Sequence, residues 1–165
     1  MFIAIISDLH DNLTNLKKFL AFAKENHIKQ LIICGDTCAP STLREIAKKF
    51  NSQIHVVFGN VCDRENEPKV VKEFTHITHY GDLAELKIDN KKIALTHYPD
   101  IAKELAATQK YDFVFYGHNH KPWIEQVGRT TLANPGTLAG MFSKATFAIW
   151  NTETNKLELK ILELI

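Results

Sequence analysis

Cysteine is scarce in this 165-residue chain, and the three that occur, Cys34, Cys38 and Cys62, lack the spacing of a zinc knuckle or a disulfide framework. Long hydrophobic runs are also missing: the apolar start, Met1 to Ile6, is too short for a signal sequence, and no stretch approaches a membrane span. Neither sign of charge dominates, because 20 basic residues face 19 acidic ones. We therefore expect a cytoplasmic protein without a membrane partner, and nothing indicates nucleic-acid binding.

Glycine-rich phosphate loops are absent as well. No Gly-x-Gly-x-x-Gly or Walker-type sequence follows the first apolar run, which argues against a nucleotide-binding doubly wound domain. What is present is an ordinary globular composition, with 45% hydrophobic and 24% charged residues. Residues 1–165 are long enough to bury a core without disulfides, so we expect them to form a single domain.

The first half of the chain alternates short apolar runs with helical periodicity. The runs 2–6, 31–34 and 54–58 are rich in β-branched residues and predict buried strands. Apolar residues at helical spacing predict helices over 13–23 and 41–50, between these strands. Such short alternating connections imply a mainly parallel sheet with helices packed on its faces.

The second half predicts a different order of elements. Segments 83–89 and 92–96 flank an Asn90-Lys91 turn and predict an antiparallel hairpin, and a helix is expected over 100–108. Further strands are expected at 113–116, 123–127, 130–133, 145–150 and 157–162. The prediction is therefore an α/β fold in which two mixed sheets pack together and are flanked by helices.

Residues of the types that commonly bind metals follow the apolar runs at the point where each run ends. Five runs are followed by seven such residues: Asp8, His10, Asp36, Asn60, His97, His118 and His120. Loops after the carboxyl ends of parallel strands share one edge of a sheet, so these side chains can converge. Glycines at 35, 59 and 117 directly precede three of them and allow close backbone approach around a crowded centre.

Each of these residues alone has an ordinary explanation, because Gly-Asp and Gly-Asn pairs form turns and a histidine after a strand is usually a loop residue. Their succession is more specific. Ser7-Asp8-Leu9-His10, Gly35-Asp36, Gly59-Asn60, Thr96-His97, Gly117-His118-Asn119-His120 and Asn134-Pro135-Gly136-Thr137 occur in this order. With them, residues 2 to about 150 resemble the calcineurin-like metallophosphoesterase superfamily, especially its small bacterial and archaeal phosphodiesterases.

The resemblance implies a four-layer αββα sandwich with two divalent metal ions. Asp8, His10, Asp36 and His120 would hold one ion, and Asp36, Asn60, His97 and His118 would hold the other. Manganese is the expected metal, with iron, zinc or nickel as alternatives, since carboxylate, amide and imidazole ligands suit all four. Asp36 and Asn60 are then also catalytic residues, and a metal-bridging hydroxide would attack the phosphorus of a small phosphoester substrate.

The chain departs from the family pattern around Asn60. Many relatives have a histidine after this asparagine that assists the leaving group, whereas Val61, Cys62 and Asp63 follow here. Asp63 is a candidate substrate contact or a turn-forming residue, and Asn12 is a candidate substrate contact or a helix cap. After the histidine at position 97, relatives of the small branch often continue Gly-His, whereas Tyr98-Pro99-Asp100 follows here, so a second active-site histidine is absent. The Cys62 thiol could have a lowered pKa near cations, or be a structural residue.

Two alternatives to a phosphodiesterase remain open. One is a phosphomonoesterase, because metal ligands fix the reaction type and not the groups around phosphorus. The other is a non-catalytic scaffold that acts through a protein partner, although the complete ligand set favours an enzyme. Relatives often assemble, so a homo-oligomer is expected from the resemblance. His76 and His79 lie outside the strand-end loops, and we expect them to be solvated or partly buried surface residues without a metal.

Overall fold

Residues 1–165 of the computed structural model form two β-sheets that pack face to face. The first sheet contains, in spatial order, β11 (Lys156–Ile161), β10 (Thr146–Asn151), β1 (Phe2–Ile6), β2 (Gln30–Ile33), β3 (Gln53–Val56) and β4 (Ile77–His79). The second contains β5 (Leu83–Ile88), β6 (Lys91–Thr96), β7 (Phe113–Phe115), β9 (Thr130–Asn134) and β8 (Trp123–Val127). Strands β1 to β4 pair in parallel, as do β6, β7 and β9.

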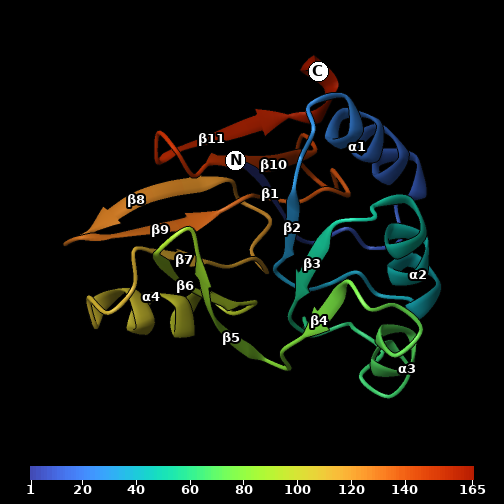
Figure 1. The fold of residues 1–165 in the computed structure, drawn as a ribbon, viewed down its shortest axis with the longest axis horizontal. Helices are drawn as coiled ribbons and strands as arrows, with labels where there is room; N and C mark the ends of the chain where they lie inside the picture. Colours follow the sequence, from blue (N-terminus) through green and yellow to red (C-terminus); the bar gives the residue numbers. More distant parts are fainter.

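Helices cover the outer face of each sheet (Figure 1). The helices are α1 (Leu13–Glu25), α2 (Pro40–Lys49), α3 (Glu67–Val71), α4 (Pro99–Ala107) and the 3-10 turn η1 (Leu162–Leu164). The first three pack on the first sheet, whereas α4 packs on the second. This arrangement is the predicted four-layer order of helix, sheet, sheet and helix. None of the helices has the length and apolar character that a membrane crossing requires.

Side-chain alternation along β1 divides the core between two layers. Ile3 and Ile5 face the second sheet, where they join Trp150 and Phe115. Ala4 and Ile6 point the opposite way, into the core beneath the helices. Because both faces of the strand are covered, β1 is apolar throughout instead of alternating polar and apolar residues. Each sheet is thereby fixed on both sides, and the loops at its end have a rigid support.

Three short elements, α3, β4 and η1, were not predicted, and one turn differs. Helix α3 has five residues and strand β4 has three, too few for a hydrophobic period to show. In the β5–β6 hairpin, Asp89 and Asn90 form the turn with φ of 45° and 63°, one residue earlier than the predicted Asn90-Lys91. Positive φ at two central residues is the geometry of tight hairpin turns and suits Asp and Asn.

Candidate metal centre

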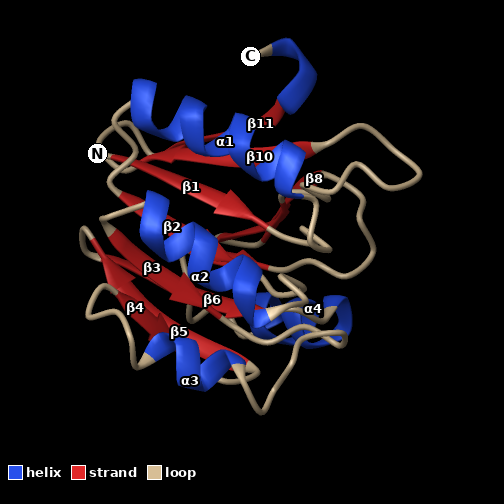
Figure 2. Cartoon of the chain, turned by 90° about the vertical axis from the view of Figure 1, so that its right-hand side faces the viewer, coloured by secondary structure: helices blue, strands red, loops and turns tan.

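The loops that follow β1, β2, β3, β6 and β7 carry all seven predicted ligands to one end of the sandwich. Figure 2 shows the β1 arrow pointing into the loops at this end. The ligand atoms form two groups, and the atoms of each group all lie within 4.8 Å of one another. One group consists of Asp8, His10 and His120, and the other of Asp8, Asp36 and His97. The structure therefore brings together residues that are up to 112 positions apart, as the sequence pattern predicts.

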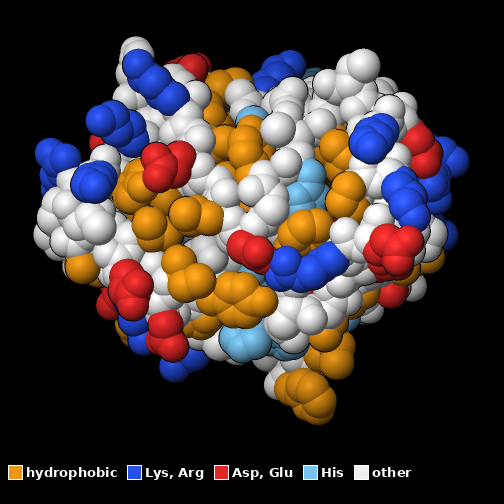
Figure 3. Space-filling model, turned by 90° about the horizontal axis from the view of Figure 1, so that it is seen from below, with side chains coloured by type: hydrophobic (Ala, Val, Ile, Leu, Met, Phe, Trp, Pro, Cys, Tyr) orange, Lys and Arg blue, Asp and Glu red, His pale blue; other side chains and the backbone are white.

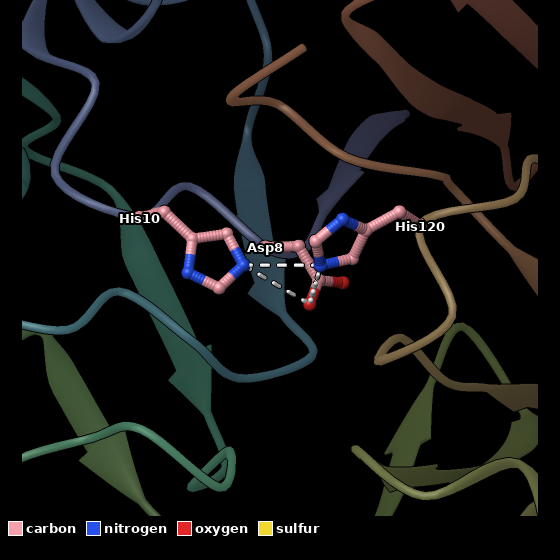
Figure 4. Close-up of side chains that lie close together, drawn as sticks. All are labelled: Asp8, His10 and His120. Carbon is pink, nitrogen blue, oxygen red and sulfur yellow. Dashed lines mark hydrogen bonds and ion pairs between the residues drawn. The ribbon is translucent and has the colours of Figure 1, made fainter. Parts of the chain in front are cut away.

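The first group is drawn in Figure 4, where the rings of His10 and His120 and the Asp8 carboxylate point toward one another. The two Nε2 atoms lie 3.1 Å apart. Asp8 Oδ1 is 3.2 Å from His120 Nε2 and 3.7 Å from His10 Nε2. Two imidazole nitrogens and a carboxylate oxygen thus face a common point.

His97, a member of the second group, also lies close to two further predicted ligands, Asn60 and His118. Its Nε2 atom lies 3.0 Å from Asn60 Oδ1, 3.3 Å from Asp36 Oδ2 and 3.3 Å from His118 Nδ1. The other ring nitrogen, Nδ1, lies 2.8 Å from the Cys34 carbonyl, to which an Nδ1–H would donate. With the proton on Nδ1, the lone pair of Nε2 points at the other three residues. This is the tautomer that a metal-binding histidine needs.

A buried oxygen supports a cation at this place. Asp8 Oδ1 is inaccessible to solvent and has no hydrogen-bond partner, whereas Oδ2 accepts the backbone N–H of His118 at 3.0 Å. A buried carboxylate oxygen without a hydrogen-bond partner destabilises the folded state, and coordination of a metal ion would offset this cost. Oxygen and imidazole donors without a thiolate suit divalent first-row metals. The donor set therefore fits two divalent ions, with Asp8 common to the two groups.

The backbone is strained where it presents these ligands. Asp8, Asp36, His118 and His120 all have positive φ, at 52°, 54°, 74° and 58°. Non-glycine residues seldom adopt this conformation, and such strain concentrates at functional sites. No residue pattern indicated this strain, since only glycine marks a positive φ plainly.

Glycines before two ligands allow the predicted close approach. A Cβ at position 59 would lie 1.8 Å from Asp36 Oδ1, and one at position 117 would lie 2.0 Å from Ser7 Oγ. No side chain fits in either place. The absence of a Cβ at Gly59 and Gly117 thus lets neighbouring loops touch, and the ligands meet across that contact.

The charges of the centre are coupled. The neighbouring Asp8 carboxylate raises the pKa of His10, against the opposing effect of burial. Burial by itself would lower the pKa of His97, but Asp36 and Asp8 raise it overall. Burial would likewise raise the pKa of Asp36, and His97 with the Val61 N–H lowers it. The carboxylates thus attract positive charge into the centre, which protons or metal ions can supply.

The two predicted substrate contacts have structural hydrogen bonds. Asn12 Oδ1 accepts the Asn15 N–H at the start of α1, and its Nδ2 donates to the Ala139 carbonyl. The Asp63 carboxylate accepts from the backbone and side chain of Asn66. Both residues therefore act as a cap or a turn, and their contact with substrate stays a prediction.

Asn134, the first residue of the Asn-Pro-Gly-Thr segment, supports the Gly-His-x-His loop. Asn134 Nδ2 donates to the Gly117 carbonyl at 3.0 Å and to Asn119 Oδ1 at 2.8 Å.

Burial raises the pKa of the Cys62 thiol, whose sulfur accepts the Gly59 N–H. Without a cation, therefore, Cys62 is a structural thiol and not a reactive one.

Sequence reasoning missed a buried pair behind the centre. Glu67 is fully buried, and one carboxylate oxygen accepts the hydroxyl of Thr37, the neighbour of Asp36. The other lies 3.5 Å from Nε2 of His79, whose side chain is only 7% exposed. His79 is thus partly buried, and its side chain is enclosed with Glu67. A lone Glu in a polar segment carries no signal for such burial.

Comparison with known proteins agrees with this geometry. Residues 1–155 match the family model of the calcineurin-like phosphoesterase superfamily domain, so the chain belongs to the calcineurin-like phosphoesterase superfamily. It is 28% identical over 167 residues to phosphodiesterase MJ0936 of Methanocaldococcus jannaschii, covering 99% of this chain and all of that protein. It is 25% identical over 146 residues to phosphodiesterase YfcE of Escherichia coli, covering 81% of this chain and 77% of that protein.

Solved structures show the same fold. A structure described as a novel archaeal phosphodiesterase superposes with a TM-score of 0.90 and 28% identity, covering 98% of this chain and 99% of the other. Vps29 of Entamoeba histolytica, in a complex with Zn²⁺, has a TM-score of 0.71 and 19% identity, covering 98% of this chain and 99% of that one. The second likeness extends to the fold alone.

Proposed function

We propose that the chain is a metal-dependent phosphodiesterase that hydrolyses a P–O bond of a small phosphoester. The carrying observation is the convergence of two carboxylates, one amide and four imidazoles, with an unpartnered buried oxygen of Asp8 among them. The relatives named phosphodiesterases, MJ0936 and YfcE, support the diester preference. Absence of a histidine after Asn60 also favours diesters with good leaving groups.

The proposed ligands of one ion are Asp8, His10, Asp36 and His120, and those of the other are Asp36, Asn60, His97 and His118. Two divalent ions, with Mn²⁺ proposed first and Fe, Zn or Ni as alternatives, would lower the pKa of a water molecule and neutralise charge on the phosphoryl oxygens.

The chain's own residues hold this arrangement. The Cys34 carbonyl fixes the tautomer of His97, and the His118 N–H orients the Asp8 carboxylate. Asn60 Oδ1 lies between His97 Nε2 and His118 Nδ1, at 3.0 and 2.9 Å. Asn60 and His118 are exposed and form the solvent-facing edge of the site. Preorganised ligands of this kind need little rearrangement when charge develops on the substrate.

A scaffold that acts through a protein partner is the second candidate, an alternative that the family resemblance leaves open. The complete ligand set argues for an enzyme. A scaffold does not need metal-ligand residues that have a strained backbone and include a buried carboxylate oxygen without a hydrogen-bond partner. The phosphomonoesterase alternative differs only in the substrate and is separated by the same assay.

The test measures bound metal and hydrolysis of bis(4-nitrophenyl) phosphate and 4-nitrophenyl phosphate with Mn²⁺. Asp36→Ala and His97→Ala are expected to lose metal and to lower kcat by at least about a hundredfold. His27→Asn, a substitution at an exposed histidine outside the site, is the matched control and keeps both. Hydrolysis that persists in Asp36→Ala and His97→Ala overturns the proposal, and hydrolysis of the monoester alone reassigns the substrate class.

A further inference from the structure

A basic hollow lies at the end of the second sheet that is away from the metal centre. It consists of two adjoining hollows, of about 500 and 300 Å³, which share four lining residues: Lys92, Lys110, Tyr111 and Arg129. Lys92 is the second residue of β6, Lys110 precedes β7 and Arg129 precedes β9. These residues therefore lie at the amino ends of three parallel strands, whereas the proposed metal ligands of this sheet follow carboxyl ends.

Three basic side chains at this hollow have no acidic partner. Lys92, Lys110 and Arg129 are exposed, and none of their side-chain nitrogens lies within 4.0 Å of a carboxylate oxygen. The two other arginines of the chain, by contrast, form ion pairs with Glu73 and Asp82. Like charges that line one hollow repel one another, and a bound anion would remove that repulsion.

The acidic residues on the rim of the hollow have other partners. Glu85 Oε1 accepts the Tyr111 hydroxyl at 2.8 Å. Asp112 Oδ1 lies 3.4 Å from Lys91 Nζ, and its Oδ2 accepts the Lys92 backbone N–H at 2.8 Å. Neither carboxylate forms an ion pair with the three basic side chains, so the hollow keeps an excess of positive charge.

Arg129 is held in a defined orientation. Its backbone N–H donates to Gln109 Oε1 at 2.7 Å, and its Nε donates to the Gln109 carbonyl at 2.5 Å. Gln109 Nε2 in turn donates to the Val127 carbonyl at 2.9 Å, which connects the segment after α4 to the β8–β9 turn. The two Nη atoms of Arg129 donate to no group of the chain. They are available to a pair of anionic oxygens, the geometry in which a guanidinium binds phosphate.

The basic hollow has the size of a small-molecule site. Several basic side chains gather at the left of the molecule in Figure 3, the side on which Figure 1 places the β8–β9 turn. The larger hollow, of about 500 Å³, is within the range of such sites. Three positive charges in one hollow match an occupant with several negative charges in a small volume, which phosphate groups supply and a single carboxylate does not.

We propose that Lys92, Lys110 and Arg129 form a binding site for a small phosphorylated molecule, separate from the metal centre. Arg129 binds one phosphate through its Nη atoms, and the two lysines neutralise the remaining negative charge. None of these residues belongs to the metal centre, so the ligand binds whether or not the chain is a hydrolase.

The test titrates the Mn²⁺-loaded protein with inorganic pyrophosphate by calorimetry. Arg129→Gln and Lys110→Gln are each expected to raise the Kd about tenfold, the effect of losing one charge-assisted hydrogen bond. The Lys110 side chain makes no hydrogen bond within the chain, so its replacement leaves the fold intact. The matched control is Lys17→Gln combined with Lys24→Gln, which removes two positive charges beside a different hollow on α1 and keeps the wild-type Kd.

Pyrophosphate is also a ligand for metal ions, so the titration is repeated after the metal has been removed with EDTA. The rise in Kd caused by Arg129→Gln should be the same with and without metal. Three outcomes overturn the site: no binding by the wild type without metal, an unchanged Kd in both Arg129→Gln and Lys110→Gln, or an equal rise in the control.

Discussion

The Nε2 atoms of His10 and His120 lie 3.1 Å apart, although 110 positions separate the two residues in the chain. Two imidazole nitrogens at this separation cannot both present lone pairs without repulsion. A proton between them, or a cation bound to both, removes the conflict. The nearby Asp8 Oδ1, which has no hydrogen-bond partner, would supply such a cation with a third ligand.

Metal ions should therefore stabilise the fold. At a Mn²⁺ concentration 100-fold above its dissociation constant, binding adds about 2.7 kcal/mol to the free energy of unfolding. For a domain of this size, that corresponds to an increase in Tm of about 5–10 °C by calorimetry. His10→Ala removes a ligand and is expected to reduce the increase, whereas His27→Asn keeps it. An equal increase in His10→Ala would show that Mn²⁺ binds elsewhere.

Gly117→Ala should damage the centre directly, because the new Cβ would lie 2.0 Å from Ser7 Oγ and 2.8 Å from Asp8 Oδ2. The loop with His118 must then move away from Asp8, at a cost of about 1–3 kcal/mol in stability and with loss of bound metal. Gly81→Ala is the control: its φ of 78° also strains an alanine, but nothing lies within 4 Å of the added Cβ. Metal analysis should find full occupancy in Gly81→Ala, and equal occupancy in both variants would be incompatible with this packing.

Glu67 should contribute to stability from within the core. Glu67→Ala leaves the buried Thr37 hydroxyl and His79 Nε2 without their partner, and we expect a loss of about 3 kcal/mol in the free energy of unfolding. Glu73→Ala breaks an ion pair with Arg44 that is exposed to solvent, so its loss should be clearly smaller. Urea denaturation of both variants measures the difference. Equal losses would mean that the Glu67 contacts contribute no more than a surface pair.

His55 predicts a pH dependence of stability. Burial lowers the pKa of this histidine to about 4, and its ring nitrogens lie 2.9 Å from the Tyr80 hydroxyl and 3.0 Å from Gln30 Oε1. Between pH 6.5 and 4 the unfolded chain binds a proton at His55 that the folded chain does not, so this contribution, up to about 3 kcal/mol, is present above pH 6.5 and is lost toward pH 4.

The measurement compares wild type with His55→Gln, which cannot titrate at this position. Denaturation curves from pH 7 to pH 4 should show the stability of the wild type falling more steeply than that of the variant. Parallel curves would contradict the assignment, because other histidines titrate equally in both proteins.

The ligands could be predicted from sequence because their positions depend on a rule about sheets. Buried parallel strands are apolar throughout, so a polar residue such as Asp36 or His97 marks the end of the strand. Parallel pairing then brings these ends to one edge, regardless of distance along the chain. The order of elements predicted two mixed sheets flanked by helices, the family resemblance implied the four layers, and the structure confirms both.

Arg129, Glu67 and His79 could not be predicted, because their surroundings depend on contacts between segments with no periodic pattern. Glu67 belongs to a helix of five residues, and His79 ends a strand of three. In the sequence, both are polar residues in a polar stretch, which is typical of a surface. Their burial results from the packing of α3 and β4 against the Asp36 loop, and Arg129 is fixed by Gln109, 20 positions away.

Anomalous diffraction from crystals grown with Mn²⁺ tests the central claim most directly. The account predicts two peaks about 3.5–4 Å apart, one surrounded by Asp8, His10 and His120 and the other by Asn60, His97 and His118, with Asp36 contacting both. A single peak, no peak, or metal bound away from Asp36 would contradict it.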